Sequence, residues 1–372
     1  MDRDGFMQRA RELAEHGRYT AAPNPLVGAV VVREGVVIGE GWHARAGGAH
    51  AEIVALEDSG PYAEGSELYV TLEPCNHYGR TPPCTDAILR SGIRRVITGH
   101  LDPNPKMRGR SVNILREAGV EVEVLDDAFF ERQNEQFCHL MRTGRPFVHV
   151  KLAATLDGRI AAPGGESKWI TGEDARRRAH ELRAEAGAVL VGAGTANIDD
   201  PLLTPRDLPG EPPLVTRIVL DPQLTLGLDS KLARTARENP VIVFYGGDPD
   251  RGWADELRAR GVEVVPAPAA VEGGLDLVFI LEELGRRGIR GILVEGGGET
   301  AGRFVKVSLA DKLTLFYAPK LLGAGGVPLM GSLKLTHMKD APQFCVEAVD
   351  KIGEDFTVTV YPLEEEIVYR AG

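Results

Sequence analysis

Cysteine is scarce in this chain, with four residues among 372. Small proteins that depend on disulfides use cysteine far more densely, so a disulfide framework is excluded. Cys75 and Cys84 lie close together in the sequence, whereas Cys138 and Cys345 are remote and are expected only to pack in the interior. This usage favours the reducing environment of the cytoplasm.

An excess of basic charge is also missing. The 43 Lys and Arg residues are outnumbered by 54 Asp and Glu residues, which gives a formal net charge of -11. Proteins that bind nucleic acids or anionic membranes broadly normally present a basic face, so we expect neither partner. A small anionic substrate stays compatible with this charge, because a few arginines can hold one phosphate.

Long apolar runs are absent as well. No segment approaches the roughly 20 apolar residues of a membrane span. Residues 1–17 are charged throughout, so they predict an amphipathic helix and lack the apolar region of a secretory signal. With 372 residues, the chain exceeds the roughly 250 to 300 residues at which single cores stop growing, so two domains are expected.

Strand-like runs alternate with helical segments, which is typical of an α/β layer structure. The first two strands are separated only by residues 33–35, so they predict a hairpin and a mixed sheet. In this part of the chain we expect helices after His50, Cys84 and Ser111, and strands at 26–32, 36–43, 67–74 and 94–100.

A glycine and a proline in residues 142–146 end a predicted helix at 129–141, and we place a domain boundary there, between 1–145 and 146–372. The proline-rich segment 201–213 is interpreted as an ordered binding loop. The second domain is expected to contain a helix at 174–185, strands at 147–155, 188–195, 217–221, 240–246 and 291–298, and a hairpin at 346–362.

One group of residues indicates a metal site. His50-Ala51-Glu52 is followed, after a predicted strand, by Pro74-Cys75 and then by Cys84. One imidazole and two thiolates suit zinc, and three protein ligands leave the fourth position for water, as catalytic sites require. Zinc lowers the pKa of that water, so a nucleophile is available near neutral pH.

Glu52 is the predicted general acid and base, because the opening turn of a helix would bring its carboxylate to the water. His50 and Cys84 are both expected at helix starts, where the dipole favours thiolate and hydroxide. Alternatives remain: a lone His-x-Glu is common, and two cysteines can be buried or can hold a structural zinc. His77 is read either as a fourth ligand or as a substrate contact.

Zinc nucleobase deaminases combine H-x-E with P-C-x-x-C. Here eight residues separate the two cysteines, and their sequence, Asn-His-Tyr-Gly-Arg-Thr-Pro-Pro, resembles the deaminase domain of the bifunctional riboflavin-biosynthesis family. In that family a diaminohydroxyphosphoribosylaminopyrimidine deaminase is joined to a reductase. The resemblance implies a cytidine-deaminase-like α/β/α layer domain.

Further segments carry the same resemblance. Residues 22–28 resemble the family's PNP-x-VG segment, in which Asn24 would meet the pyrimidine, although a loop cap is the structural alternative. His77, Arg80 and Lys106 suit a phosphoribosyl tail, whereas surface cations ordinarily face water. Ser111 departs from the family pattern, which has glycine there.

Residues 151–159, 166–171 and 195–204 resemble the reductase domain of this family, which has a dihydrofolate-reductase-like α/β fold. The resemblance implies that the substrate is held by Lys151, Ser167, Arg183, Leu203, Arg206 and Glu295. It likewise implies that NADPH is contacted by Ala154, Trp169, Thr195, Asp199, Gly297, Gly298, Glu299, Thr300, Ala301, Gly302 and Arg303.

Two of these assignments have a direct physical reason. Guanidinium groups bind phosphate oxygens in pairs, which suits Arg183 and Arg206, although Arg183 in a basic helix could be solvated instead. A glycine-rich turn that enters a helix after residue 294 can accept a pyrophosphate, but it is not the Rossmann pattern. Pro222 stands where the family has Ser, and the reductase proton donor is either Lys151 or Glu295.

The sequence therefore predicts a bifunctional enzyme of the riboflavin pathway that uses Zn²⁺ and NADPH. It would deaminate 2,5-diamino-6-(5-phosphoribosylamino)pyrimidin-4-one at C2 and then reduce the ribosyl chain to ribityl. The resemblance also implies a homo-oligomer through the second domains. The alternatives are a nucleic-acid base deaminase with an appended domain, disfavoured by the acidic charge, and a binding module with structural zinc.

Overall fold

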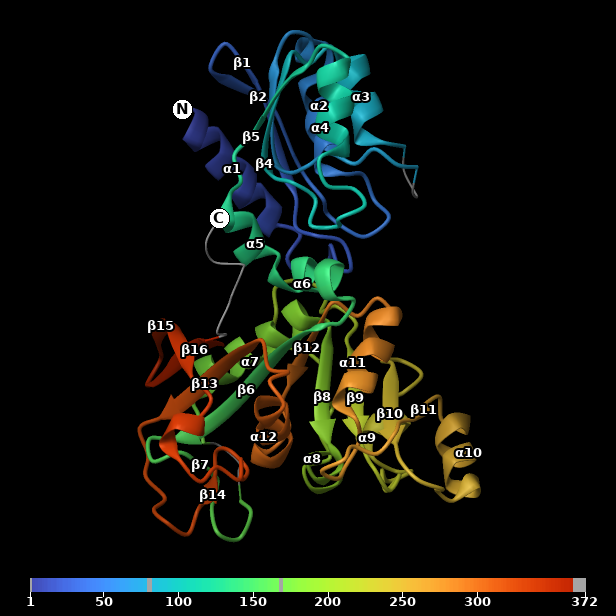
Figure 1. Cartoon of the computed structure of the whole chain (residues 1–372), viewed down its shortest axis with the longest axis vertical. Helices are drawn as coiled ribbons and strands as arrows, with labels where there is room; N and C mark the ends of the chain where they lie inside the picture. The colour runs from blue at the N-terminus through green and yellow to red at the C-terminus, as the bar shows by residue number, and fades with distance from the viewer. Residues whose placement is uncertain (1, 79–81, 167–169, 364–372) are drawn as a thin grey trace. The chain divides into compact units, whose positions relative to one another are not determined.

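The computed structural model describes residues 2–78, 82–166 and 170–363 (Figure 1). Contacts divide the chain into two compact units, Met1–Gly144 and Arg145–Gly372. The division follows α6 (Glu135–Thr143), which ends at Gly144 with a φ of 71°. Glycine adopts this left-handed conformation without the penalty that a Cβ atom would cause.

The first unit contains a five-stranded sheet in the order β2-β1-β3-β4-β5. Strand β1 pairs antiparallel with both of its neighbours, β2 and β3, whereas β3, β4 and β5 are parallel to one another. The predicted hairpin and mixed sheet are therefore confirmed. The strands are β1 (Gly28–Arg33), β2 (Val36–Trp42), β3 (Glu67–Leu72), β4 (Arg95–His100) and β5 (Glu121–Val124).

Helices cover both faces of this sheet (Figure 1). Along β1, Val30 and Val32 face α1, whereas Ala29 and Val31 face the opposite core, as the two-residue period of a strand requires. The helices are α1 (Arg3–Glu15), α2 (Ala51–Ser59), α3 (Cys84–Ser91), α4 (Arg110–Glu117) and α5 (Ala128–Gln133), and η1 (Gly60–Ala63) is a short 3₁₀ turn.

Glycine lets α2 approach β2 closely. A Cβ atom at Gly41 would lie 2.4 Å from the carbonyl oxygen of Ala51, and one at Gly39 would lie 2.3 Å from that of Ala55. Any larger residue would therefore push the helix away from the strand. This close packing fixes the start of α2, and with it the position of His50.

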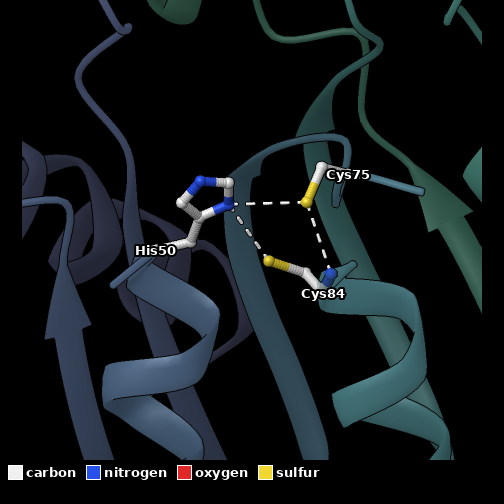
Figure 2. Close-up of side chains that lie close together, drawn as sticks. All are labelled: His50, Cys75 and Cys84. Carbon is white, nitrogen blue, oxygen red and sulfur yellow. Dashed lines mark hydrogen bonds between the residues drawn. The ribbon is translucent and has the colours of Figure 1, made fainter. Parts of the chain in front are cut away.

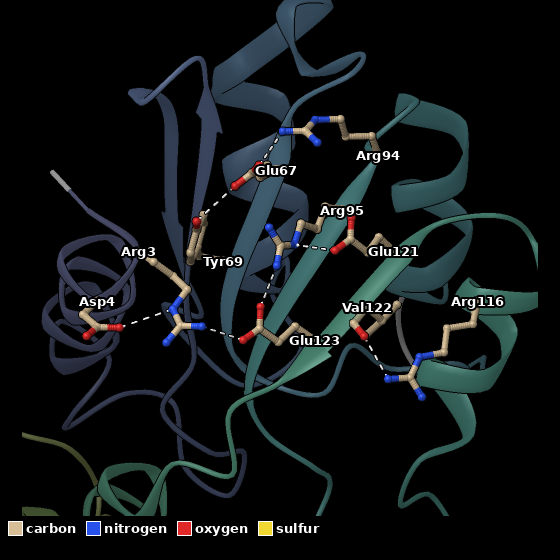
Figure 3. A network of polar contacts seen from close by, with 10 residues as sticks. All are labelled: Arg3, Asp4, Glu67, Tyr69, Arg94, Arg95, Arg116, Glu121, Val122 and Glu123. Atoms are coloured by element: carbon tan, nitrogen blue, oxygen red, sulfur yellow. Dashed lines mark hydrogen bonds and ion pairs between the residues drawn. The ribbon is translucent and has the colours of Figure 1, made fainter.

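Charged side chains gather where β3, β4 and β5 begin (Figure 3). Arg95 donates to Glu123 at 2.7 Å, and Glu123 also accepts from Arg3 at 2.7 Å. Glu67 accepts from Arg94 and from the hydroxyl of Tyr69. Most of these groups are partly exposed, so each pair adds little stability, and the predicted functional residues lie at the opposite, carboxyl ends of the strands.

The helix predicted at 129–141 is wrong in one respect. Asn134, with φ −120° and ψ 27°, interrupts it and separates α5 from α6. Its side chain binds the backbone of Leu26, which lies 108 residues earlier. A tertiary contact therefore overrides a continuous helical pattern, and periodicity alone does not reveal such a contact.

The described part of the second unit contains a nine-stranded sheet in the order β11-β10-β9-β8-β12-β6-β13-β16-β15, plus a small β14-β7 pair. Neighbouring strands from β11 to β13 are parallel, and the last two strands form the predicted antiparallel hairpin. The strands are β6 (Phe147–Thr155), β7 (Arg159–Ala161), β8 (Ala188–Gly192), β9 (Thr216–Leu220), β10 (Val241–Tyr245), β11 (Glu263–Pro266), β12 (Gly291–Val294), β13 (Lys312–Ala318), β14 (Val327–Pro328), β15 (Phe344–Ile352) and β16 (Asp355–Pro362).

Two predicted strands of this unit extend too far. The strand at 188–195 ends at Gly192, and the strand at 291–298 ends at Val294, because helices begin at Ala193 and Gly298. The helices are α7 (Glu173–Ala186), α8 (Ala193–Ile198), α9 (Lys231–Arg234), α10 (Arg251–Ala259), α11 (Leu277–Arg286) and α12 (Gly298–Lys306), with a 3₁₀ turn η2 (Met338–Asp340). None of the described helices is long and apolar enough to cross a membrane.

Candidate functional site

The three predicted metal ligands meet at the carboxyl end of the first sheet. His50 precedes α2, Cys75 follows β3, and Cys84 opens α3 (Figure 2). Nδ1 of His50 lies 3.2 Å from Sγ of Cys84 and 3.4 Å from Sγ of Cys75. The three donor atoms all lie within 4.8 Å of one another.

The electrostatics of this cluster favour one thiolate, on Cys75, and one thiol, on Cys84. A hydrogen bond from the Cys84 thiol lowers the pKa of Cys75 to about 4, and the backbone N–H of Cys84 also donates to that sulfur at 3.3 Å. The proton shared with Cys75, together with burial, raises the pKa of Cys84. One nitrogen and two sulfurs at these separations fit a zinc ion, whose binding displaces the remaining thiol proton.

Glu52 lies beside the cluster in the first turn of α2 and is only 3% exposed. Burial raises its pKa to about 7, and the negative charge of the nearby Cys75 thiolate acts in the same direction. A carboxyl group here can exchange protons with a molecule bound next to the metal ligands.

Asn24 joins the same region through a histidine that the sequence analysis did not identify. Its Nδ2 lies 3.0 Å from Nε2 of His43, whose Nδ1 lies 3.0 Å from the carbonyl oxygen of Ala49. Since that oxygen only accepts, Nδ1 of His43 carries the proton and Nε2 accepts from Asn24. Burial lowers the pKa of His43, which keeps this arrangement neutral.

Glu73 organises the loop of residues 102–111. Its buried carboxylate accepts three backbone N–H groups, from Asp102 at 3.0 Å, Gly109 at 2.8 Å and Ser111 at 3.0 Å. Only the backbone of Ser111 is used, and Gly109, with a φ of 78°, makes the left-handed turn. The local structure therefore accommodates the serine that departs from the family pattern.

The other predicted contacts of this unit have different surroundings. His77 is exposed but close enough to Asp102 to influence the pKa of that carboxyl, which burial raises. Lys106 is exposed in the loop that Glu73 organises, and its backbone N–H donates to Asn104 at 3.1 Å. Arg80 lies outside the described residues.

Three charged residues meet in the second unit. Arg183 of α7 donates two hydrogen bonds to Glu295, at 2.8 and 2.7 Å, and these side chains are only 15% and 9% exposed. Burial alone would raise the pKa of Glu295, but the charges and hydrogen bonds of Arg183, with Lys151, hold it at about 2. Burial lowers the pKa of Lys151, whose Nζ lies 5.3 Å from the ring centre of Phe316.

The loop after α8 passes beside this cluster. Arg183 donates to the carbonyl oxygen of Thr204 at 3.2 Å, while the side chain of Leu203, with a φ of 58°, is buried in the core. Only the backbone of Leu203 can therefore contact a ligand without rearrangement. Arg206 is 61% exposed, and its nearest carboxylate partner, Asp207, lies 3.8 Å away.

A buried arginine binds the backbone of the loop that follows α8. Arg217 of β9 is fully buried and donates to the carbonyl oxygens of Leu202 at 3.2 Å and Thr235 at 3.0 Å, and to the hydroxyl of Thr235 at 2.7 Å. It also donates to the carbonyl of Asn239. Asp200 and Leu203 of this loop have positive φ angles, which are unfavourable for residues other than glycine. The hydrogen bonds from Arg217 help to hold the loop in this conformation.

The predicted glycine-rich turn lies at the carboxyl end of β12, next to that of β8. A Cβ atom at Gly192 would lie 2.7 Å from the hydroxyl of Thr300, and one at Gly297 would lie 4.0 Å from the hydroxyl of Thr195, with no nearer atom. Gly297 is also the N-cap of α12, where backbone N–H groups lack helical partners. This arrangement fits an anionic nucleotide at a parallel-strand edge.

Several other residues assigned to NADPH pack against neighbouring segments of the protein. A Cβ atom at Gly298 would lie 2.9 Å from the carbonyl of Leu329, and Gly302 packs against Gly331. Arg303 donates to the carbonyl of Leu275 at 2.7 Å. Ala154 and Ala301 are fully buried, whereas Asp199 and Glu299 are exposed. Trp169 and the substrate residue Ser167 lie outside the described residues.

Pro222 marks a further departure from the family pattern. It follows Asp221, whose buried carboxylate accepts the backbone N–H groups of Thr225 at 2.6 Å and Leu226 at 2.7 Å. The hydroxyl of Thr225 in turn accepts from Asn197 in α8 at 3.0 Å. The turn is therefore built without a side-chain donor at position 222.

Both units match known families. Residues 1–100 match the cytidine and deoxycytidylate deaminase zinc-binding region, and residues 146–358 match the RibD C-terminal domain. The riboflavin biosynthesis protein RibD of Aquifex aeolicus is 43% identical over 354 residues, which cover 95% of this chain and 96% of that protein. The chain belongs to the RibD family.

Solved structures of the RibD family agree over nearly the full length. Acinetobacter baumannii RibD, form 2, is 34% identical, with a TM-score of 0.87 and coverage of 96% of this chain and 98% of that one. A Thermotoga maritima diaminohydroxyphosphoribosylaminopyrimidine deaminase/5-amino-6-(5-phosphoribosylamino)uracil reductase is 38% identical, with a TM-score of 0.84 and coverage of 97% and 98%. The predicted cytidine-deaminase-like and dihydrofolate-reductase-like units are confirmed.

As a RibD, the chain is a bifunctional deaminase and reductase of riboflavin biosynthesis, as the sequence predicted. Its first unit is a zinc-binding deaminase, and its second is a reductase, which implies a nucleotide cofactor. The sequence analysis missed His43, Glu73 and Arg217. His43 acts on the side chain of Asn24, whereas Glu73 and Arg217 bind backbone groups elsewhere in the chain, so no local spacing in the sequence marks these residues.

Proposed function

We propose that the first unit removes the 2-amino group of 2,5-diamino-6-(5-phosphoribosylamino)pyrimidin-4-one. The second unit would then reduce the ribosyl chain of the product with NADPH, giving a ribityl chain. The observation that carries the proposal is the group formed by His50, Cys75 and Cys84, with donor atoms within 4.8 Å and the buried carboxyl of Glu52 beside them.

In this proposal His50, Cys75 and Cys84 hold the zinc ion, and His77 faces the substrate because a fourth protein ligand would exclude water. Zinc, when bound, supplies the Lewis acid that makes a water molecule nucleophilic near neutral pH. Both thiols must stay reduced to bind it, which supports a cytoplasmic location.

Glu52 moves the protons of this reaction. Its carboxylate takes a proton from the attacking water and passes it to a ring nitrogen while the new C2–O bond forms. Glu52 then takes the second proton of the water from the new hydroxyl group at C2 and gives it to the amino group, the C2–N bond breaks, and ammonia leaves. The burial that raises the pKa of Glu52 favours a group that can both accept and donate near neutral pH.

Substrate recognition follows from the side chains around this cluster. Asn24, whose amide is oriented by His43, would contact the pyrimidine. His77, Arg80 and Lys106 would supply donors and positive charge for the phosphoribosyl group. A nucleic-acid base as substrate is disfavoured because the chain carries a net charge of -11.

In the second unit, the N-terminus of α12 would hold the NADPH phosphates. Gly297, Glu299, Thr300 and Thr195 border it, and the remaining contacts are proposed for Ala154, Trp169, Asp199, Gly298, Ala301, Gly302 and Arg303. NADPH, when bound, supplies the hydride that reduces C1′ of the ribose.

Lys151 is the better candidate for the proton donor of this reduction. Both oxygens of Glu295 already accept hydrogen bonds from Arg183, and its low pKa keeps it ionised and without a proton to give. Lys151 carries protons, and burial lowers its pKa toward the range in which it can release one. Ser167, Leu203 and Arg206 would complete the substrate site with Arg183.

We also propose that the enzyme is a homo-oligomer through its second unit. Exposed apolar side chains lie on the edge strand β15, where Val346 and Val349 are each 63% exposed. Leu321 and Met338, in the segment before that strand, are 74% and 89% exposed. A paired edge would shield such groups from water, and sedimentation of the full chain tests this assignment.

Incubation of the full chain with the diaminopyrimidine phosphate, with and without NADPH, tests the central proposal. Ammonia release without NADPH, followed by NADPH oxidation only after deamination, is the expected result. Faster ammonia release from a tRNA or DNA substrate would contradict the substrate assignment. Retention of zinc without either reaction would instead favour a binding module.

A further inference from the structure

A buried amide connects two distant segments of the deaminase unit. Asn134 is 4% exposed and lies between α5 and α6. Its Oδ1 accepts the backbone N–H of Leu26 at 2.7 Å, and its Nδ2 donates to the carbonyl oxygen of the same residue at 3.2 Å. One side chain thus satisfies both backbone polar groups of Leu26, in the way that a neighbouring strand would.

The helix does not use this side chain for capping. Asn134 occupies the N-cap position of α6, where asparagine ordinarily accepts a backbone N–H of the first turn. Here it makes no side-chain cap hydrogen bond. The amide instead points toward Leu26. Asn134 therefore binds the loop that contains Leu26 and does not stabilise α6 by capping it.

The preceding residue holds the other end of that loop. Nε2 of Gln133 donates to the backbone carbonyl of Arg11 at 3.2 Å and to the carboxylate of Glu15 at 2.6 Å, both in α1. Residues 16–27 connect α1 to β1. The junction between α5 and α6 therefore fixes this connection at its start, through Gln133, and at its end, through Asn134.

The same loop leads to the metal ligands. Asn24 lies two residues before Leu26 and contacts His43, whose backbone N–H donates to the carbonyl of Val27 at 2.9 Å. His43 contacts the carbonyl of Ala49, the residue before His50. A displacement of Leu26 would therefore shift Asn24 relative to the place where the metal ligands converge.

We propose that Asn134 is a positioning residue of the deaminase, which sets the loop of Asn24 at the distance the pyrimidine requires. The inference rests on the proposed function, because that function assigns Asn24 to the substrate. It gives Asn134 a role in substrate affinity and orientation, with no contact to the substrate itself.

The test is Asn134→Ser in the full chain. Serine is a good N-cap, so it can cap α6 and offset part of the lost stability, but it is too short to bind both backbone groups of Leu26. We expect the KM of the deaminase for the diaminopyrimidine phosphate to rise about tenfold or more. Zinc content and NADPH-dependent reduction should change little, and the melting temperature should fall only modestly. Asn113→Ser, at an exposed position of α4, is the matched control.

Hydrogen exchange provides a readout that does not depend on the substrate. The backbone amides of Leu26 and His43 should exchange faster in Asn134→Ser than in the control variant. Unchanged exchange, or a lower melting temperature with an unchanged KM, would overturn the positioning role. Failure of the proposed function would look different. Either the wild-type protein would not deaminate the pyrimidine at all, or it would do so and Asn24→Ala would leave its KM unchanged.

Discussion

The ion pair between Arg183 and Glu295 allows a quantitative prediction. Both side chains are buried, they share two hydrogen bonds, and Lys151 is the second cation that lowers the pKa of Glu295. Glu295→Gln leaves two buried cations without an anion, whereas Arg183→Met leaves the carboxylate with Lys151 as a remaining partner. The glutamine variant should therefore be the less stable of the two.

The expected magnitudes follow from this difference. Loss of one partner of a buried ion pair costs about 3–5 kcal/mol, which we assign to Glu295→Gln. Arg183→Met should lose on the order of 1–3 kcal/mol, because the charge of Lys151 compensates part of the loss. The double variant should be destabilised by about 0.5–3 kcal/mol less than the sum of the two single variants.

Urea unfolding of the full chain, followed by hydrogen exchange and mass spectrometry, measures these losses. Peptides of the second unit report the change, and peptides of the first unit serve as the internal control. If Arg183→Met destabilises the protein as much as Glu295→Gln, Lys151 does not compensate the carboxylate. Strict additivity in the double variant would show that the pair does not act as a unit.

Two further predictions concern the second unit. Arg217→Lys keeps the charge, but lysine cannot donate to all of the carbonyl groups that Arg217 binds, among them that of Leu202. The substrate KM of the reductase should therefore rise severalfold. An unchanged KM in steady-state kinetics would show that Arg217 does not support the loop. His149 is buried, its Nε2 lies 2.8 Å from the hydroxyl of Thr314, and burial lowers its pKa well below the usual value of about 6.5. Since the unfolded chain binds this proton more readily, its contribution to stability should be present above about pH 6.5 and fall as the pH drops further, by at most about 1.4 kcal/mol per pH unit. His149→Gln should reduce this dependence in urea titrations between pH 7.5 and 5.5, and an unchanged slope would refute the assignment.

The sequence was most informative where chemistry depends on residue type and short spacing. His50, Cys75 and Cys84 are predicted in this way as metal ligands, and the structure brings their donor atoms together. Strand positions along β1 and β3 were also clear, because their apolar runs are buried on the sheet. These features are encoded within segments of the chain.

Features that depend on distant contacts were not predictable in this way. The helix break at Asn134 depends on Leu26, and the loop near Leu203 depends on Arg217 of a strand that follows it. Lys151 and Glu295 could not be distinguished until the structure placed Arg183 against the carboxylate. In each case the deciding partner lies far away in the sequence, so propensity and periodicity carry no information about it.

The most direct test of the proposed chemistry is ammonia release by Glu52→Gln. The variant should retain its zinc and its reductase activity, because the amide fills the same buried space beside α2, while deamination should fall by about 10² to 10⁴-fold. Metal content and NADPH oxidation, measured on the same preparation, exclude a general loss of structure. Deamination at the wild-type rate by the zinc-loaded variant would contradict the role assigned to Glu52.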